Sequence, residues 1–161
     1  MSEVRRVAQQ GEAILSLQAA AIEEEEFSSH WLTALIQSMH ATMDAKAGVG
    51  IAAPQIYVSK RVIIVASRPN IRYPDAPDMP ALVMINPEIL SSSAQVELGE
   101  EGCLSVAEQR GIIARAAHII VRFQRLDGTS HEQAFSGFPA RIVQHEIDHL
   151  NGVLFVDYLS A

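Results

Sequence analysis

The chain carries a His-Glu-x-x-His pattern close to its C-terminus, formed by His145, Glu146 and His149. Residues four apart lie on one face of an α-helix, so the two imidazoles are expected one turn apart. Two imidazoles at that spacing bind one metal ion, and Glu146 beside them is a candidate general base. The same pattern occurs on ordinary helices whose histidines are satisfied by hydrogen bonds. Two histidines do not complete a metal site, so a third ligand is required.

The third ligand is expected upstream of this pattern. Thermolysin-like enzymes take it from beyond the helix, but only a short segment follows His149, and its sole carboxylate is Asp157. Cys103, the only cysteine of the chain, lies in Glu101-Gly102-Cys103-Leu104-Ser105. A thiolate there would complete a Cys/His/His site with an open fourth position for water, the arrangement of catalytic metal centres. The alternative for Cys103 is a small buried hydrophobic residue.

Three stretches of the chain resemble the motifs of peptide deformylases, in the order and at separations like those of that family. They are Gly48-Val49-Gly50-Ile51-Ala52-Ala53-Pro54-Gln55, Glu101-Gly102-Cys103-Leu104-Ser105 and Gln144-His145-Glu146-Ile147-Asp148-His149-Leu150-Asn151-Gly152. The resemblance extends over about residues 31–159, and residues 1–28 match less clearly. One such motif is weak evidence of kinship, whereas three together are highly specific.

The resemblance implies a metal-dependent hydrolase that removes the N-formyl group from the N-terminal methionine of newly made polypeptides and releases formate. One divalent metal ion, commonly Fe²⁺ in this family with Zn²⁺, Ni²⁺ or Co²⁺ as substitutes, would be held by Cys103, His145 and His149. Glu146 would accept a proton from the attacking water and give it to the leaving amine. The Gln55 side-chain amide and the Leu104 backbone N–H would stabilise the oxyanion together with the metal.

N-formyl-methionyl peptides and nascent chains are the partners that the resemblance implies. The glycine-rich first motif would present extended backbone to the peptide, which is recognition by strand addition. An apolar methionine pocket and close backbone approach to the ligand are expected from five residues: Val49, Gly50, Gly102, Phe138 and Ile142.

Charged residues near the motifs have two interpretations each. Glu101 and Arg115 occupy places where family members carry an ion pair that steadies the cysteine segment; otherwise they are unrelated surface charges. Arg141 precedes His145 by one helical turn and either reaches the pocket rim or is exposed. Asp148 either orients a ligand imidazole or a nearby arginine, or is a solvated helix carboxylate.

The chain also departs from the usual family pattern. Ala107 stands where proline commonly follows the cysteine motif, and Pro139 enters the first turn of the last helix, so the sequence does not predict whether activity is full. The sequence ends at Ala161 without the longer basic C-terminal helix with which some bacterial members dock on ribosomes. We therefore do not expect ribosome docking of that kind.

The elements that must position these residues predict an α+β fold in a single domain, residues 1–161. We expect antiparallel β-sheets packed around a central C-terminal helix that bears the metal ligands, plus an N-terminal helix over residues 30–46, capped by Ser28 or Ser29. Trp31 and the leucines and methionines that follow it recur at helical spacing. Strands are expected over residues 61–66, 81–85 (ending at Asn86-Pro87), 95–98, 112–113, 118–126 and 132–135, with a hairpin turn at Asp127-Gly128 and an extended tail over residues 153–158.

Composition excludes several classes of protein. Apolar residues make up 48% of the chain, as in an ordinary globular domain, and the net charge is −7. The sequence has no basic cluster of the kind that binds nucleic acid directly and no apolar run that spans a membrane. No secretion signal is evident, so we expect a cytoplasmic protein.

Two other functions fit the same motifs. One is a non-catalytic, metal-stabilised protein that binds peptide N-termini, and the other is an amidase or metallopeptidase acting on a different N-acyl group. Release of formate from formyl-methionyl peptides separates both from a deformylase.

Overall fold

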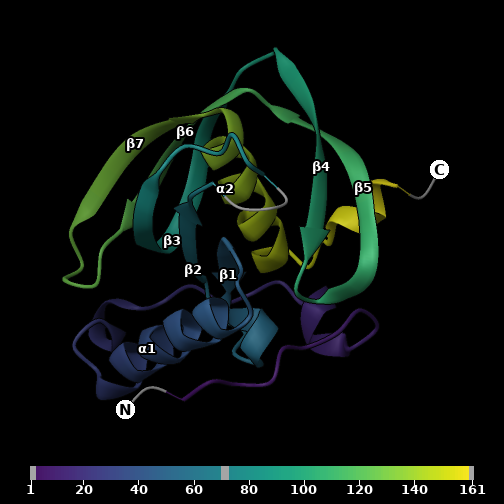
Figure 1. The fold of residues 1–161 in the computed structure, drawn as a ribbon. Coiled ribbons are helices and arrows are strands. Elements are labelled where there is room, and N and C mark those ends of the chain that lie inside the picture. The colour runs from purple at the N-terminus through teal and green to yellow at the C-terminus, as the bar shows by residue number, and fades with distance from the viewer. Residues whose placement is uncertain (1–2, 70–72, 160–161) are drawn as a thin grey trace.

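The computed structural model describes residues 3–69 and 73–159 of the chain, which form an α+β fold (Figure 1). The described residues contain two α-helices, α1 (His30–Ala45) and α2 (Gly137–Leu150). An antiparallel five-stranded sheet has the order β1-β2-β3-β6-β7, with strands Gly50–Ala52, Val62–Ser67, Met79–Ser92, His118–Gln124 and Ser130–Ser136. A separate two-stranded sheet pairs β4 (Val96–Cys103) with β5 (Val106–Ala116). The predicted α+β class is confirmed.

Helix α2 lies at the centre of the molecule, between the two sheets (Figure 1). Its apolar side, which includes Ala140, Val143, Ile147 and Leu150, packs in one buried cluster with residues of β2, β3, β6 and β7. Each of these four side chains is at most 6% exposed. Burying a side chain of this size contributes about 1.5–3 kcal/mol, so the cluster fixes α2 firmly against the sheet.

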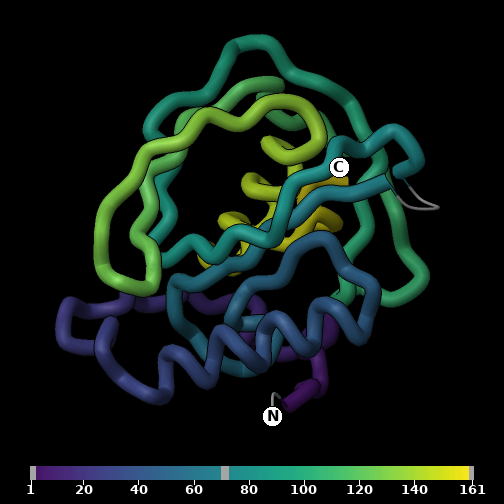
Figure 2. Tube along the Cα trace, turned by 60° about the vertical axis from the view of Figure 1, so that its left-hand side comes forward, coloured from purple at the N-terminus to yellow at the C-terminus, as the bar shows by residue number. Residues whose placement is uncertain are grey.

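Strand β2 is buried on both faces, which explains its unbroken run of β-branched residues. Ile63 and Val65 belong to the cluster around α2, whereas Val62 and Ile64 belong to a second cluster on the opposite face. That second cluster contains the leucines, isoleucine and methionines of α1. Helix α1 runs along the large sheet on the side away from α2 (Figure 2). The two helices therefore pack on opposite faces of β2.

Helix α1 agrees with its predicted range apart from one residue at its C-terminal end. The hydroxyl of Ser29 accepts a hydrogen bond from Leu32 N at 3.4 Å, so Ser29 is the N-cap. Trp31 matches the helical spacing but is 40% exposed, with the ammonium of Lys60 6.0 Å from its ring centroid. The periodic pattern located the helix, but one apolar position that it marks, Trp31, is exposed.

The predicted end of a strand at Asn86-Pro87 is wrong, because β3 continues to Ser92. The pairing of β3 with β6 shifts register between Ile85 and Glu88, and Asn86 has a φ of 51°. The Asn86 side chain accepts from Ile22 N at 2.8 Å and donates to Ile22 O at 2.9 Å. The asparagine and proline thus form a bulge whose side-chain hydrogen bonds replace a ladder pair.

The predicted strands over residues 95–98 and 112–113 are too short. Strand β4 reaches Cys103, and β5 begins at Val106, so the cysteine ends a strand instead of lying in a loop. The predicted extended tail is also wrong, since Phe155–Tyr158 forms a 3₁₀ turn. The hairpin turn at Asp127-Gly128 is confirmed between β6 and β7, with Gly128 at a φ of 84°.

The N-terminal segment ties two parts of the fold together. Ala8 N donates to Gln55 O at 2.7 Å, and Gln10 N donates to Ser105 O at 2.8 Å. These bonds join the segment to the 3₁₀ turn Ala53–Ile56 and to the turn between β4 and β5. In the part of the chain that the structure describes, no helix has the length and apolar character needed to cross a membrane.

Candidate active site

Helix α2 and the end of β4 bring three metal-binding side chains together. One ligand atom each from Cys103, His145 and His149 lies within 4.8 Å of the others, and Cys103 Sγ lies 3.3 Å from His149 Nε2. The two histidines share one face of α2, as their spacing predicts. Strand β4 brings the sulfur to that same face of α2.

The surroundings of Cys103 favour a thiolate. Burial of the sulfur raises the pKa of the thiol, but the nearby imidazoles of His149 and His145 outweigh that effect and hold the pKa well below its usual value. Ser105 N also donates to Cys103 Sγ at 3.4 Å. A deprotonated sulfur is the form that binds metals.

Glu101 is buried and joins one ligand of the cluster to two arginines. Its Oε1 lies 2.9 Å from His145 Nδ1, and both of its oxygens accept from Arg115, at 2.8 and 2.9 Å. Burial raises the pKa of Glu101, but the hydrogen bonds from Arg115 and His145 outweigh it and lower the pKa to about 2. The ion pair between Glu101 and Arg115 is therefore present, and the two are not unrelated surface charges.

Arg141 is the second arginine on Glu101. Its NH1 group donates to Glu101 Oε2 at 2.8 Å and to Ile113 O at 2.9 Å, and its NH2 group donates to Glu97 O at 2.8 Å. The residue is 7% exposed and lines the pocket described below. Gly99 makes this possible, since a Cβ there would lie 2.7 Å from the guanidinium carbon. The interpretation of Arg141 as an exposed helix arginine is wrong.

Asp148 supports the same network from the far side of Arg115. Its Oδ2 accepts from Arg115 NH1 at 2.6 Å and from the Tyr158 hydroxyl at 2.9 Å. The carboxylate thus orients a nearby arginine, which was one of the two interpretations of Asp148. The turn Phe155–Tyr158 places the tyrosine, a contact that the sequence did not predict.

Glu146 lies beside the cluster in a buried position. It is 4% exposed, and burial raises the pKa of its carboxyl to about 7. Its Oε1 is buried without a hydrogen-bond partner among the described residues. A Cβ at Gly50 would lie 2.5 Å from Glu146 Oε2, so β1 passes this carboxylate only because residue 50 is glycine.

Gln55 is fixed next to Cys103 by hydrogen bonds at both ends of its amide. Its Oε1 accepts from Ala52 N at 2.9 Å, and its Nε2 donates to Ser105 Oγ at 3.0 Å and to Cys103 Sγ at 3.6 Å. The side chain is 1% exposed and belongs to the 3₁₀ turn that follows β1.

One pocket gathers most of the predicted site residues. Its lining includes the predicted catalytic residues and two metal ligands, together with the predicted substrate-binding residues: Gln55, Leu104, Glu146, Cys103, His145, Val49, Gly50, Gly102, Phe138 and Ile142. His149 lies behind Cys103, and Arg115 lies behind Glu101. The sequence therefore named residues that the fold brings together from β1, β4 and α2.

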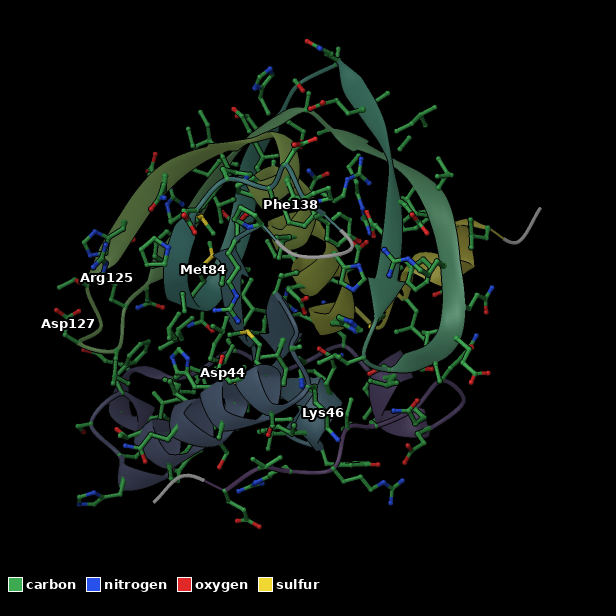
Figure 3. The ribbon with its side chains drawn as sticks, in the orientation of Figure 1. Asp44, Lys46, Met84, Arg125, Asp127 and Phe138 are labelled. Carbon is green, nitrogen blue, oxygen red and sulfur yellow. The ribbon has the colours of Figure 1, made fainter. Side chains whose placement is uncertain are left out.

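Two pocket residues were missed by the sequence analysis. The Tyr73 ring packs on Phe138, labelled in Figure 3, with 4.4 Å between the ring centroids. Arg110 NH2 donates to the Tyr73 hydroxyl at 2.7 Å, and Arg110 crowds Gly102 so closely that a Cβ there would collide with it. Tyr73 lies in the proline-rich connection before β3, where no local pattern indicates a pocket residue.

The residues present fit a divalent transition metal. One thiolate and two imidazoles are the donor set of a three-ligand catalytic centre. Because Glu101 holds His145 Nδ1, the other ring nitrogen of His145 is left for a ligand, as in carboxylate–histidine–metal arrangements. The unpartnered, buried Glu146 Oε1 beside the cluster points to a further polar group, such as water, in the pocket.

Comparison with known proteins agrees with this site. The model of the polypeptide deformylase family matches residues 4–161. Peptide deformylase 2 of Shewanella oneidensis is 50% identical over 147 residues, which cover 91% of this chain and 80% of the relative.

The solved structures similar to this chain include peptide deformylases. The class I type b peptide deformylase of Acinetobacter baumannii bound to Met-Ala-Ser has a TM-score of 0.96 and 60% identity, with 98% of this chain and 99% of that chain covered. The actinonin-bound structure has a TM-score of 0.90 and 54% identity, with 99% and 100% covered. This chain belongs to the polypeptide deformylase family, whose members are metal-dependent hydrolases that remove the N-formyl group from nascent polypeptides.

Proposed function

We propose that this chain deformylates newly made polypeptides at the pocket between β1, β4 and α2, with one divalent metal ion held by Cys103, His145 and His149. The observation that carries the proposal is the meeting of these ligand atoms within 4.8 Å, with the unpartnered carboxylate oxygen of Glu146 beside them. When bound, a divalent ion supplies Lewis-acid polarisation of the formyl carbonyl and lowers the pKa of a coordinated water.

Glu146 is the proposed general base and acid. Its carboxylate follows His145 on α2 and faces the backbone of Gly50, so it borders the position of the reacting group. Oε1, which has no partner among the described residues, accepts the proton of the attacking water. The same oxygen then returns the proton to the methionine amine as the carbon–nitrogen bond breaks. Formate and a free N-terminus are the products.

Gln55 and Leu104 are the proposed donors to the oxyanion. The Gln55 amide is already oriented by Ala52 N, which bonds its Oε1 and leaves Nε2 directed toward Cys103. Leu104 follows Cys103 directly and lines the pocket, so its backbone N–H is close to the ligand sulfur. One donor of this type contributes about 2.7–4 kcal/mol to the transition state.

The substrate backbone is proposed to add to the free edge of β1. Among the described strands, β1 is at the edge of its sheet and pairs with β2, so its other edge is available to a peptide. Val49, Phe138 and Ile142 form the apolar wall that would receive the methionine side chain. Gly50 and Gly102 line the same pocket, but their bare sides face Glu146 and Arg110, so the close backbone approach that they allow is to these side chains. The A. baumannii enzyme was solved bound to Met-Ala-Ser, which supports a peptide as the ligand of this pocket.

Glu101 and Arg115 are the proposed supports of the ligand set. Glu101 contacts His145 directly and lies two residues before Cys103, so one carboxylate steadies ligands from both α2 and β4. Arg115 neutralises that buried charge and is itself held by Asp148. The arrangement keeps the ligands in place independently of substrate.

Fe²⁺ is the ion we propose for the site, with Zn²⁺, Ni²⁺ or Co²⁺ able to replace it. A mixed sulfur and nitrogen donor set accepts all four ions, so availability decides among them. We further propose that the chain is one domain acting in the cytoplasm on nascent chains, without direct nucleic-acid contact.

Anaerobic purification followed by metal analysis and a formate-release assay tests this proposal. We expect one equivalent of metal per chain and stoichiometric formate from formyl-Met-Ala-Ser. Binding of that peptide without formate would instead support a non-catalytic binding protein. Faster hydrolysis of the acetyl peptide would support a different amidase.

A further inference from the structure

A second groove continues the active-site pocket past Leu104. It is lined by Arg6, Val7, Gln9, Lys46 and Leu104. Leu104 borders both hollows, and Ala47 and Gly48, which follow Lys46 in the chain, line the first. The two hollows are therefore neighbouring parts of one surface.

The N-terminal segment builds this groove onto the β4–β5 turn. Gln9 Nε2 donates to Val7 O at 3.1 Å and to Leu104 O at 3.2 Å. Gln10 N donates to Ser105 O at 2.8 Å. These bonds hold Val7 and Gln9 against the residue that separates the groove from the pocket.

The direction of a bound peptide follows from Gly50 and Lys46. Gly50 touches Glu146, so the formyl end of a substrate lies near Gly50. A peptide that leaves this point along the first motif passes Gly48 and Ala47 and reaches Lys46. An extended chain rises about 3.3 Å per residue, so residues three and four of the substrate come within reach of the lysine side chain.

The charge of the groove is positive although the whole chain carries −7. Within residues 3–69 and 73–159, the ammonium of Lys46 has neither an ion pair nor a hydrogen bond. Arg6 is partly neutralised, because its NH2 group contacts Glu12 at 3.0 Å. None of the described residues that line the groove carries a carboxylate side chain. Lys46 is thus the cation left to meet a substrate.

We propose that this groove is a subsite for the chain downstream of the formyl-methionine, and that Lys46 makes it prefer acidic side chains at residues three and four. The inference rests on the proposed function, since it extends the same peptide path. Lys46 is a specificity-determining residue here and takes no part in the chemistry.

The test compares formyl-Met-Ala-Glu-Glu-amide with its Gln-Gln and Lys-Lys counterparts. The native protein is expected to favour Glu-Glu over Gln-Gln by about twofold to fivefold in kcat/KM, because an exposed ion pair contributes little more than that. The difference should lie in KM and shrink in 1 M salt, where charges are screened. The variant Lys46→Glu is expected to reverse the order of Glu-Glu and Lys-Lys.

Arg125→Glu is the matched control, because it makes the same charge change in the exposed hairpin, well away from Lys46 (Figure 3). It should keep the native preference. Equal kcat/KM for the three peptides, or the same reversal in both variants, would overturn the subsite. Absence of formate from all three peptides would instead contradict the proposed function, so the two failures are distinguishable.

Discussion

Oε1 of Glu101 lies 2.9 Å from Nδ1 of His145, which ties a β4 carboxylate to a metal-ligand candidate on α2. The contact fixes the orientation of the imidazole and leaves its other nitrogen for the cluster. Because Glu101 also binds Arg115 and Arg141, the ring belongs to a buried network of four charged or ionisable side chains. The candidate site is therefore preorganised by the fold.

Glu101→Gln should weaken both metal binding and folding. Loss of a partner that orients a metal-bound histidine typically costs about 10- to 100-fold in metal affinity. The change also leaves two buried guanidinium groups without their shared carboxylate, which we expect to destabilise the fold by about 3–5 kcal/mol. Competition with a chromogenic chelator and thermal unfolding measure the two effects. The control is Glu100→Gln at the exposed neighbour, and equal behaviour of both variants would contradict the role of Glu101.

Gly50→Ala should reduce turnover while metal binding persists. The added Cβ would lie 2.5 Å from Glu146 Oε2, so the carboxylate or β1 must move. Misplacement of a catalytic group by about 1 Å costs on the order of 10²-fold in rate. Formate release and metal content of the purified variant report the two properties. Gly48→Ala is the milder comparison, because its Cβ meets the flexible Leu104 side chain at 3.1 Å. Full turnover in Gly50→Ala would show that Glu146 needs no such room.

Removal of the metal should stop formate release without unfolding the protein. Helix α2 is held by the apolar cluster that it forms with β2, β3, β6 and β7, independently of any ion. Circular dichroism after chelation should therefore stay unchanged, and Fe²⁺, Ni²⁺ or Co²⁺ should restore activity. Loss of helical signal on chelation would mean that the metal is needed for the fold itself.

The sequence predicted the parts of the site that short patterns encode. The His-Glu-x-x-His spacing placed two candidate ligands on one helix face with Glu146 beside them, and the segment around Cys103 offered the third. Arg110 and Tyr73 were not assigned, because their positions depend on contacts between segments far apart in the chain.

The fold was predicted in outline for a similar reason. The run of β-branched residues in β2 predicts a strand, and the helical spacing of apolar residues in α1 predicts a helix, so both elements are visible in the local sequence. The continuation of β3 through Asn86-Pro87 has no such signal, because it depends on two hydrogen bonds between the Asn86 side chain and the backbone of Ile22. Likewise, Glu101 and Gly102 are residue types that do not favour a strand, yet β4 continues through them because it pairs with β5 as far as Cys103.

Glu146→Ala tests the central claim most directly, since it removes the proposed proton carrier and none of the proposed ligands. The variant should fold and retain about one equivalent of metal, while formate release from formyl-Met-Ala-Ser falls by at least about 10²-fold, the usual lower bound for general acid–base catalysis. Near-native formate release from metal-loaded Glu146→Ala would contradict the account.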